Sequence, residues 1–220
     1  MKLTAPKDLH KYLRDTEHAV RHLYAGLGSC WSYYQQATEH WDISQTGQPM
    51  TPERKAALDR YLHLARQYFD LKPSEATFAG AILQLAYMAV RLYSRNNTIP
   101  PDSLILVHPS QKTAVQFCIG PLRHGIRTGL IVFAARNQYN HWDEEEPHQP
   151  TRKIFDALSV AFSDNMWADL AFELSNPTIN IYSNEILLTA LGWKTYDIYL
   201  TEVSAMLGAS SQITNASVDS

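Results

Sequence analysis

The sequence has 220 residues, a formal net charge of −3, 45% apolar residues and 19% charged residues. Such a chain is typical of an ordinary soluble globular protein that can bury a sizeable core. The weakly acidic balance disfavours non-specific binding to long duplex nucleic acid, although a local basic site can still bind RNA.

Three features predict a cytoplasmic protein without membrane contact. The N-terminus lacks the apolar core and the cleavage site of a secretory signal. The most apolar stretch, residues 78–90, is well short of the roughly 20 residues that a spanning helix needs. Cys30 and Cys118 both fall within apolar patterns and are far apart in sequence, which predicts buried free thiols and no disulfide framework.

The first half of the chain reads as three helices. Apolar residues recur at three- and four-residue steps from about residue 7 to residue 40, interrupted only by Gly26 and Gly28, which indicate a bend or a close helix contact. The Thr-Pro-Glu run at 51–53 predicts the start of a second helix, because it supplies a hydroxyl cap, a first-turn proline and a carboxylate. We expect the Lys-Pro pair at 72–73 to end it.

The third helix is expected to begin at the following Ser-Glu pair and to lie at the centre of a bundle, since residues 78–90 are apolar on nearly every side. Periodicity and turn residues predict the remaining elements: a short helix near 110–118, a basic loop at 120–129, a buried helix from 129, a break at 143–151, helices at 154–162, 183–191 and 196–207, and an irregular stretch at 170–181.

These elements predict an all-α fold: a single helical bundle with long antiparallel helices and an irregular C-terminal part. We expect one domain over residues 1–207. Residues 208–220 are small and polar, which predicts a flexible tail.

One polar stretch stands out, Ala-Ala-Arg-Asn-Gln-Tyr-Asn-His-Trp-Asp at 134–143, which follows the apolar run 129–133. On a continuous helix Arg136 and His141 point about 140° apart, whereas Asn137 lies one turn from His141, and Arg136 one turn from Asn140. Two polar ridges therefore share one broad face. A two-fold axis through this face would form a cleft with two arginines and two histidines.

Such a cleft is suited to RNA cleavage without a metal or another cofactor. A guanidinium offers a planar fork to phosphate oxygens, and a histidine that titrates near neutral pH can move protons to and from the reacting oxygens. The amides of Asn137 and Asn140 can orient these groups. The RNA 2′-hydroxyl would be the nucleophile and the feature that separates RNA from DNA.

The run Arg136-Asn-Gln-Tyr-Asn-His141 resembles the signature of the HEPN superfamily, an arginine, a polar residue and a histidine five positions after the arginine. The resemblance implies a compact helical bundle, a homodimer and a metal-independent endoribonuclease of a toxin–antitoxin or other defence system. It implies that Arg136 and His141 are the catalytic pair, that Asn137 is the accompanying polar residue, and that single-stranded or structured RNA is the substrate.

Some toxins of the family carry a tyrosine two residues after the histidine, which a partner nucleotidyltransferase modifies. Asp143 occupies that position here, within the acidic run 143–146. This run could suppress activity or bind a basic partner, such as an antitoxin or a regulatory protein.

Three questions remain open beside the assignment of the catalytic pair. The motif could belong to a non-catalytic HEPN-like module that binds a nucleotide or a protein. Arg123 and Arg127, just before the motif helix, could bind the RNA backbone or belong to an ordinary solvated loop. His18 and His22 have a zinc-binding spacing, but no third ligand follows in a recognisable arrangement, so a solvated face is preferred.

Overall fold

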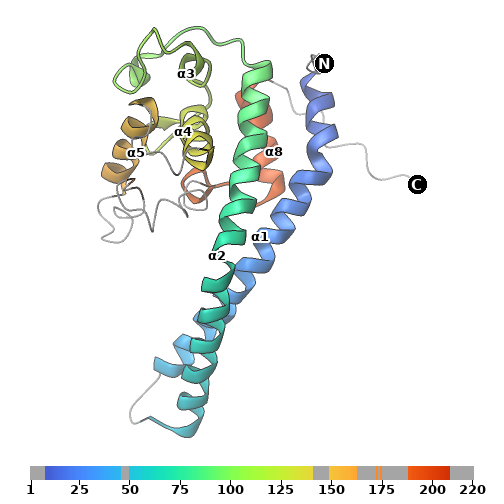
Figure 1. The fold of residues 1–220 in the computed structure, drawn as a ribbon, viewed down its shortest axis with the longest axis vertical. Coiled ribbons are helices and arrows are strands. Elements are labelled where there is room, and N and C mark those ends of the chain that lie inside the picture. The colour runs from blue at the N-terminus through green and yellow to red at the C-terminus, as the bar shows by residue number, and fades with distance from the viewer. Residues whose placement is uncertain are drawn as a thin grey trace, which may run out of the picture.

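A computed structural model describes residues 8–45, 50–140, 149–162, 172, 174 and 188–208. The fold is all-α, as predicted, and the described residues add only a two-stranded hairpin (Figure 1). Two long antiparallel helices, α1 (Leu9–Gln45) and α2 (Pro52–Tyr93), form its axis. The other elements are η1 (Pro101–Ser103), α3 (Lys112–Gln116), β1 (Leu122–Arg123), β2 (Ile126–Arg127), α4 (Thr128–Asn140), α5 (Gln149–Ala161) and α8 (Tyr196–Met206).

Helix α2 begins where the sequence predicts but does not end there. The Oγ1 atom of Thr51 accepts a hydrogen bond from the backbone N–H of Arg54 at 3.3 Å, which caps the helix. The predicted break at the Lys-Pro pair 72–73 is wrong, because α2 runs through Pro73. Pro73 is exposed, so the backbone carbonyl that loses its N–H partner can bond to water, while Ala76 on the next turn is buried. Packing against α1 thus outweighs the local penalty of the proline.

The two glycines of α1 have different surroundings. A Cβ atom at Gly26 would lie 2.7 Å from a ring carbon of Phe78, so the missing side chain allows close approach to α2. Nothing lies within 4 Å of such an atom at Gly28. The sequence indicates either a bend or a close helix contact at these glycines, and Gly26 makes a close helix contact.

The basic segment before α4 is a tight hairpin where the sequence predicted a loop. Leu122 pairs with Arg127 and Arg123 with Ile126 in antiparallel register. His124 and Gly125 form the turn with φ angles of 51° and 76°. The two-residue hairpin turn whose twist matches that of the strands requires positive φ angles at both of its residues. Glycine at the second position adopts such an angle without steric cost.

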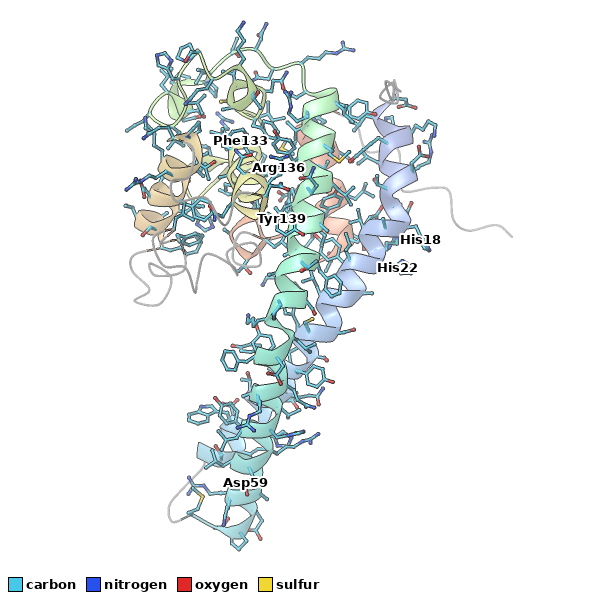
Figure 2. The ribbon with its side chains drawn as sticks, in the orientation of Figure 1. His18, His22, Asp59, Phe133, Arg136 and Tyr139 are labelled. Carbon is cyan, nitrogen blue, oxygen red and sulfur yellow. The ribbon has the colours of Figure 1, made fainter. Side chains whose placement is uncertain are left out.

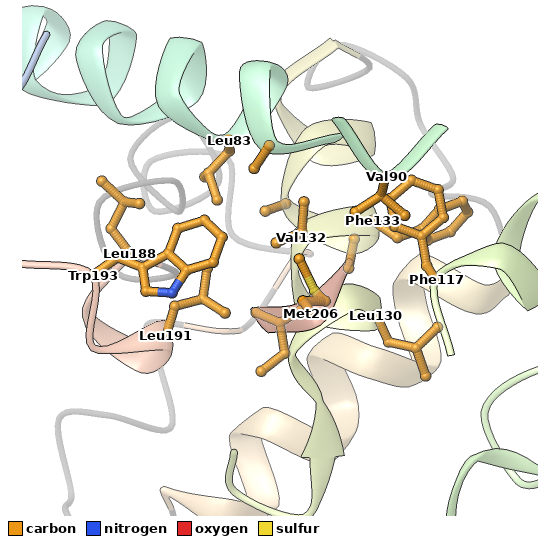
Figure 3. Close-up of a cluster of buried hydrophobic side chains, with 14 of the residues drawn as sticks. Leu83, Val90, Phe117, Leu130, Val132, Phe133, Leu188, Leu191, Trp193 and Met206 are labelled. Atoms are coloured by element: carbon orange, nitrogen blue, oxygen red, sulfur yellow. The ribbon is translucent and has the colours of Figure 1, made fainter. Parts of the chain in front are cut away.

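The core is centred on α4. Every residue from Thr128 to Ala135 is buried, because α2, α5 and the hairpin pack around this helix. Figure 3 shows Leu130, Val132 and Phe133 of α4 facing side chains of α2, α8 and the segment around Trp193. Cys30 and Cys118 are buried, as predicted, and they form no disulfide within the described residues.

The C-terminal predictions are confirmed in part. Residues 188–191 are helical, Gly192 follows with a φ of 73°, and α8 occupies the predicted last helix. The acidic run 143–146, the irregular stretch 170–181 apart from residues 172 and 174, and the tail beyond Gly208 lie outside the described residues.

Helix α2 is long and apolar enough to cross a membrane by length and composition, with a mean hydropathy of 1.2 over its best 18-residue window. A core helix of a soluble protein meets the same criterion, and 44% of this window is buried inside the structure.

Helices α1 and α2 extend well beyond the other elements, as Figure 1 shows. We call residues 32–45 and 50–74 the arm, and the remaining described residues the head. In the arm the two helices pack on each other through Ala37, Leu64 and the ring pairs Tyr34–Tyr68 and Trp41–Tyr61, which bridge α1 and α2.

Candidate functional site at the end of helix α4

The start of α4 is fixed by the segment that precedes the hairpin. The backbone N–H and the Oγ1 atom of Thr128 each donate to the carbonyl of Pro121 at 3.0 Å, and the N–H of Gly129 donates to the carbonyl of Ile119 at 3.1 Å. A Cβ atom at Gly129 would overlap the carbonyl oxygen of Phe117. Helix α4 is therefore held tightly where it begins, which sets the position of the polar residues at its other end.

Arg136 is the first residue of α4 to reach the surface, and it is half-buried against α2 (Figure 2). Its Nε atom donates to Oε1 of Gln84 at 3.1 Å, and its Nη1 atom donates to Oδ1 of Asn137 at 3.3 Å. The guanidinium carbon lies 4.7 Å from the ring centroid of Tyr87, a favourable cation–π distance. Two elements thus fix the direction of this side chain.

The charge of Arg136 is not neutralised within the described part of the chain, where its polar partners are two neutral amides and an aromatic ring. A guanidinium has five N–H donors, of which these hydrogen bonds use two. The other three have no partner among the described residues. An anion such as a phosphate would find both a positive charge and hydrogen-bond donors here.

The two predicted amides are part of the same network. Asn140 donates from Nδ2 to Oε1 of Gln84 at 3.3 Å and to the carbonyl of Arg136 at 2.9 Å. Asn137 donates from Nδ2 to Oγ1 of Thr151, a buried residue of α5, at 3.3 Å. The structure therefore brings Arg136, Asn137 and Asn140 together, and it connects α2, α4 and α5 around them.

Tyr139 packs the same turn against α2, one turn of that helix before Gln84. A Cβ atom at Gly80 would overlap the ring of Tyr139, so glycine at this position of α2 is required for the ring to pack there. Gln138, also in this turn, is 3% exposed. The polar turn therefore packs against α2 through Tyr139 as well as through Arg136 and Asn140.

His141 follows Asn140 directly in sequence and lies outside the described residues. Its role as the catalytic partner of Arg136 stays a prediction. The same holds for the acidic residues 143–146.

Arg123 and Arg127 lie at the opposite end of α4. Nine residues separate Arg127 from Arg136, or about 13 Å along a helix that rises 1.5 Å per residue. Arg127 binds Asp102 through two nitrogens and donates from Nη1 to the carbonyl of Gly120 at 3.0 Å. Hydrogen bonding from Arg127 lowers the pKa of the Asp102 carboxyl.

Arg123 forms an ion pair with Glu202 of α8, whose other carboxylate oxygen accepts a hydrogen bond from Nε1 of Trp193 at 3.0 Å. The two arginines thus tie the hairpin to its neighbours, and their predicted binding to RNA remains an expectation.

His18 and His22 lie on the exposed surface of α1 with ring centroids 4.1 Å apart (Figure 2). The Nδ1 atom of His22 lies 2.9 Å from the carbonyl of His18. Within the described ranges no group of three or more histidine, cysteine, aspartate or glutamate side chains could hold a metal ion.

Two residues of the network were not predicted from the sequence. Gln84 is the only polar residue in the apolar run 78–90, and a lone amide in such a run could have signalled a polar contact. Thr151 carries no such signal, since its partner Asn137 is 14 residues away across a polar connection.

No protein family, curated protein or solved structure matches the chain.

Proposed function

We propose that the chain is a metal-independent endoribonuclease of the HEPN type, with Arg136 and His141 in a composite site between two copies. The observation that carries the proposal is the environment of Arg136. Neutral groups orient this half-buried guanidinium, and three of its N–H donors have no partner among the residues that the structure describes. An arginine with a purely structural role more often pairs with a carboxylate, as Arg123 and Arg127 do. His141, five residues after Arg136, supplies the proton-transfer group that the resemblance to the HEPN superfamily implies.

The reaction assigned to these residues needs no group beyond the chain and the RNA. His141 accepts the proton of a 2′-hydroxyl as its oxygen attacks the adjacent phosphorus. The bond from phosphorus to the 5′-oxygen breaks, and that oxygen takes a proton from a histidinium, from the same residue or from its copy in the dimer. The products are a 2′,3′-cyclic phosphate and a 5′-hydroxyl. Arg136 holds the non-bridging oxygens, where negative charge builds up.

Asn137 and Asn140 act as positioning residues in this proposal. Asn137 accepts from the guanidinium and donates to Thr151, and Asn140 shares Gln84 with Arg136. The loss of either amide would let the guanidinium rotate away from the phosphate. A small misplacement of a catalytic group can cost about 100-fold in rate.

We place the enzyme in the cytoplasm as a toxin or defence effector, with a protein inhibitor as its natural partner. Two buried cysteines that form no disulfide within the described residues suit a reducing compartment. A toxin that cleaves the RNA of its own cell needs an inhibitor, and the negative charge of the acidic run 143–146, which follows the motif in sequence, suits a basic inhibitor.

The test is cleavage of total RNA and transfer RNA by the purified full-length protein in the presence of a chelator. We expect His141→Ala and Arg136→Gln each to lower the cleavage rate by about 100-fold or more. Matched controls are His18→Ala, an exposed histidine on α1, and Arg91→Gln, since Arg91 also binds a neutral glutamine side chain. The controls should cleave at the wild-type rate.

Equal rates for His141→Ala and the wild type would refute the catalytic assignment. If the wild type does not cleave RNA either, the motif belongs to a non-catalytic module that binds a nucleotide or a protein.

A further inference from the structure

The arm carries an aromatic groove that no described residue covers. Two ring pairs that bridge α1 and α2 form its walls: Tyr34–Tyr68, with ring centroids 5.4 Å apart, and Trp41–Tyr61, with ring centroids 5.0 Å apart. The pairs are seven residues apart on each helix, so they lie two turns apart along the same side of the arm. A hollow of about 280 Å³ lies between and beside them.

Small side chains form the floor of this groove. Ala37 of α1 and Ala65 of α2 lie between the two aromatic pairs. Because alanine leaves space where a leucine would fill the seam between two helices, the groove is a notch that can receive a bulky side chain. Every residue that lines it is uncharged.

Bulky apolar side chains project from the rim of the same surface. Phe69 is 67% exposed and Leu62 is 56% exposed, and the two lie seven residues apart on α2. Tyr34 and Trp41 are also exposed, by 55% and 42%. Single exposed apolar residues are normal, but a cluster of them on a projecting element marks an interaction site.

We propose that a second copy of this chain docks on the groove, with Phe69 of each copy inserted into the notch of the other. A two-fold contact requires one surface to carry both the hollow and the group that fills it, and this surface carries both. The residues that line the groove are uncharged, and the Lys72 ammonium, 4.4 Å from the ring centroid of Tyr68, forms an ion pair with Glu75 at 3.1 Å. Aromatic enrichment and depletion of charge are the usual composition of an interface centre.

The exposed apolar area supplies most of the apolar part of a homodimer interface and about half of its total area. A buried aromatic side chain covers about 150 to 250 Å², so the exposed parts of the three rings and Leu62 offer about 400 Å² per copy. A standard interface buries about 800 Å² per partner, of which about 500 Å² is apolar in homodimers. The polar residues that flank the groove would supply most of the remainder.

This contact is separate from the composite ribonuclease site and does not depend on it. Gln84, the α2 partner of Arg136, lies 19 residues after Ala65, or about 28 Å along the helix and about 100° around it. The groove and the end of α4 therefore lie at different heights and on different sides of α2.

The experiment measures the molar mass of the full-length protein by light scattering and its dimer dissociation constant by sedimentation equilibrium. Because the ribonuclease site would pair copies through a different surface, we expect the wild type to exceed the mass of a dimer, which is twice the chain mass of 25.0 kDa, and Phe69→Glu to fall to that mass or below it. Phe69→Glu places two carboxylates at the contact and should weaken the dimer by about 30-fold or more, the effect of losing an interface hot spot. The control Gln36→Glu adds the same charge to another face of the arm and should leave the mass unchanged.

A monomeric wild type, or a Phe69→Glu variant with the same mass as the wild type, overturns the proposal. If Phe69→Glu lowers the helical content seen by circular dichroism, the milder Leu62→Gln takes its place in the same measurement. Covalent dimers in a mixture of the Thr38→Cys protein and the Phe69→Cys protein support the predicted insertion, since Thr38 and Phe69 line the same groove and a double variant could cross-link within one copy. No cross-link in a protein that does dimerise overturns the insertion of Phe69.

Discussion

The head and the arm are built from the same two helices but bury them to different extents. In the head, Ala79, Ile82 and Leu83 of α2 are fully buried, because α4 and α8 add a second layer around the helix pair. In the arm, the buried residues within the described ranges are Ala37, Ser44, Ala57 and Leu64, and large apolar side chains remain in contact with solvent. Two helices alone cover only one stripe of each other, so the arm needs a further layer that the chain itself does not supply in the described residues.

The largest effect should come from the loss of core volume in the head. Ile131 in α4 has no exposed surface, so we expect Ile131→Ala to lower the free energy of unfolding by about 2–5 kcal/mol. Leu62→Ala on the arm should change it by less than about 0.5 kcal/mol in dilute protein, where association does not contribute. Urea unfolding followed by circular dichroism measures both, and equal losses would contradict the contrast between head and arm.

A smaller effect is expected from two glycine substitutions. A Cβ atom at Gly80 collides with the ring of Tyr139, so Gly80→Ala should destabilise the protein by about 1–3 kcal/mol and displace the polar turn of α4. Gly28 lies on α1 with free space around it, so Gly28→Ala should stabilise the protein by about 0.5–1 kcal/mol. Thermal melting tests whether Gly80→Ala lowers the melting temperature and Gly28→Ala raises it. Melting shifts of the same sign would contradict the packing of Tyr139 on Gly80.

The last effect is confined to alkaline pH and concerns the contact between α1 and α2 inside the head. Burial, with a contribution from Tyr93, raises the pKa of Tyr12 to about 12, and the Tyr12 hydroxyl donates to the carbonyl of Leu85 at 2.9 Å. The unfolded chain ionises near pH 10 while the folded chain keeps the proton, so this stability is present below pH 10 and is lost as the pH rises toward 12. The loss is about 1.4 kcal/mol per pH unit over that window.

The control for this prediction is Tyr12→Phe, which removes the ionisation together with the hydrogen bond. The variant should be less stable at neutral pH and lose less stability between pH 10 and pH 12 than the wild type. Parallel curves of melting temperature against pH for the two proteins would show that Tyr12 does not carry the alkaline sensitivity.

Elements governed by local patterns could be predicted from the sequence. The buried α4, the cap of α2 and the final helix α8 follow from apolar periodicity and capping residues that lie within each segment. The continuity of α2 through Pro73 could not be predicted from the sequence, because tertiary packing on α1 outweighs the local penalty of the proline. The hairpin before α4 was missed because its strands have only two residues each.

The candidate site was predictable to a similar degree. The spacing of Arg136, Asn137 and Asn140 on one helix places them together before any tertiary structure is known. Their partners Gln84 and Thr151 lie on other helices, and the pairing depends on how those helices pack. The same reason explains why the ion pairs of the hairpin were not predicted, since Glu202 lies 79 residues after Arg123.

The chemistry of the RNA ends tests the proposed ribonuclease activity most directly. Wild-type protein incubated with transfer RNA in chelator should leave 2′,3′-cyclic phosphate and 5′-hydroxyl ends, and His141→Ala should leave neither. Wild-type cleavage that leaves a 5′-phosphate, or ends of unchanged chemistry and yield with His141→Ala, would contradict a site in which His141 moves the proton and Arg136 holds the phosphate.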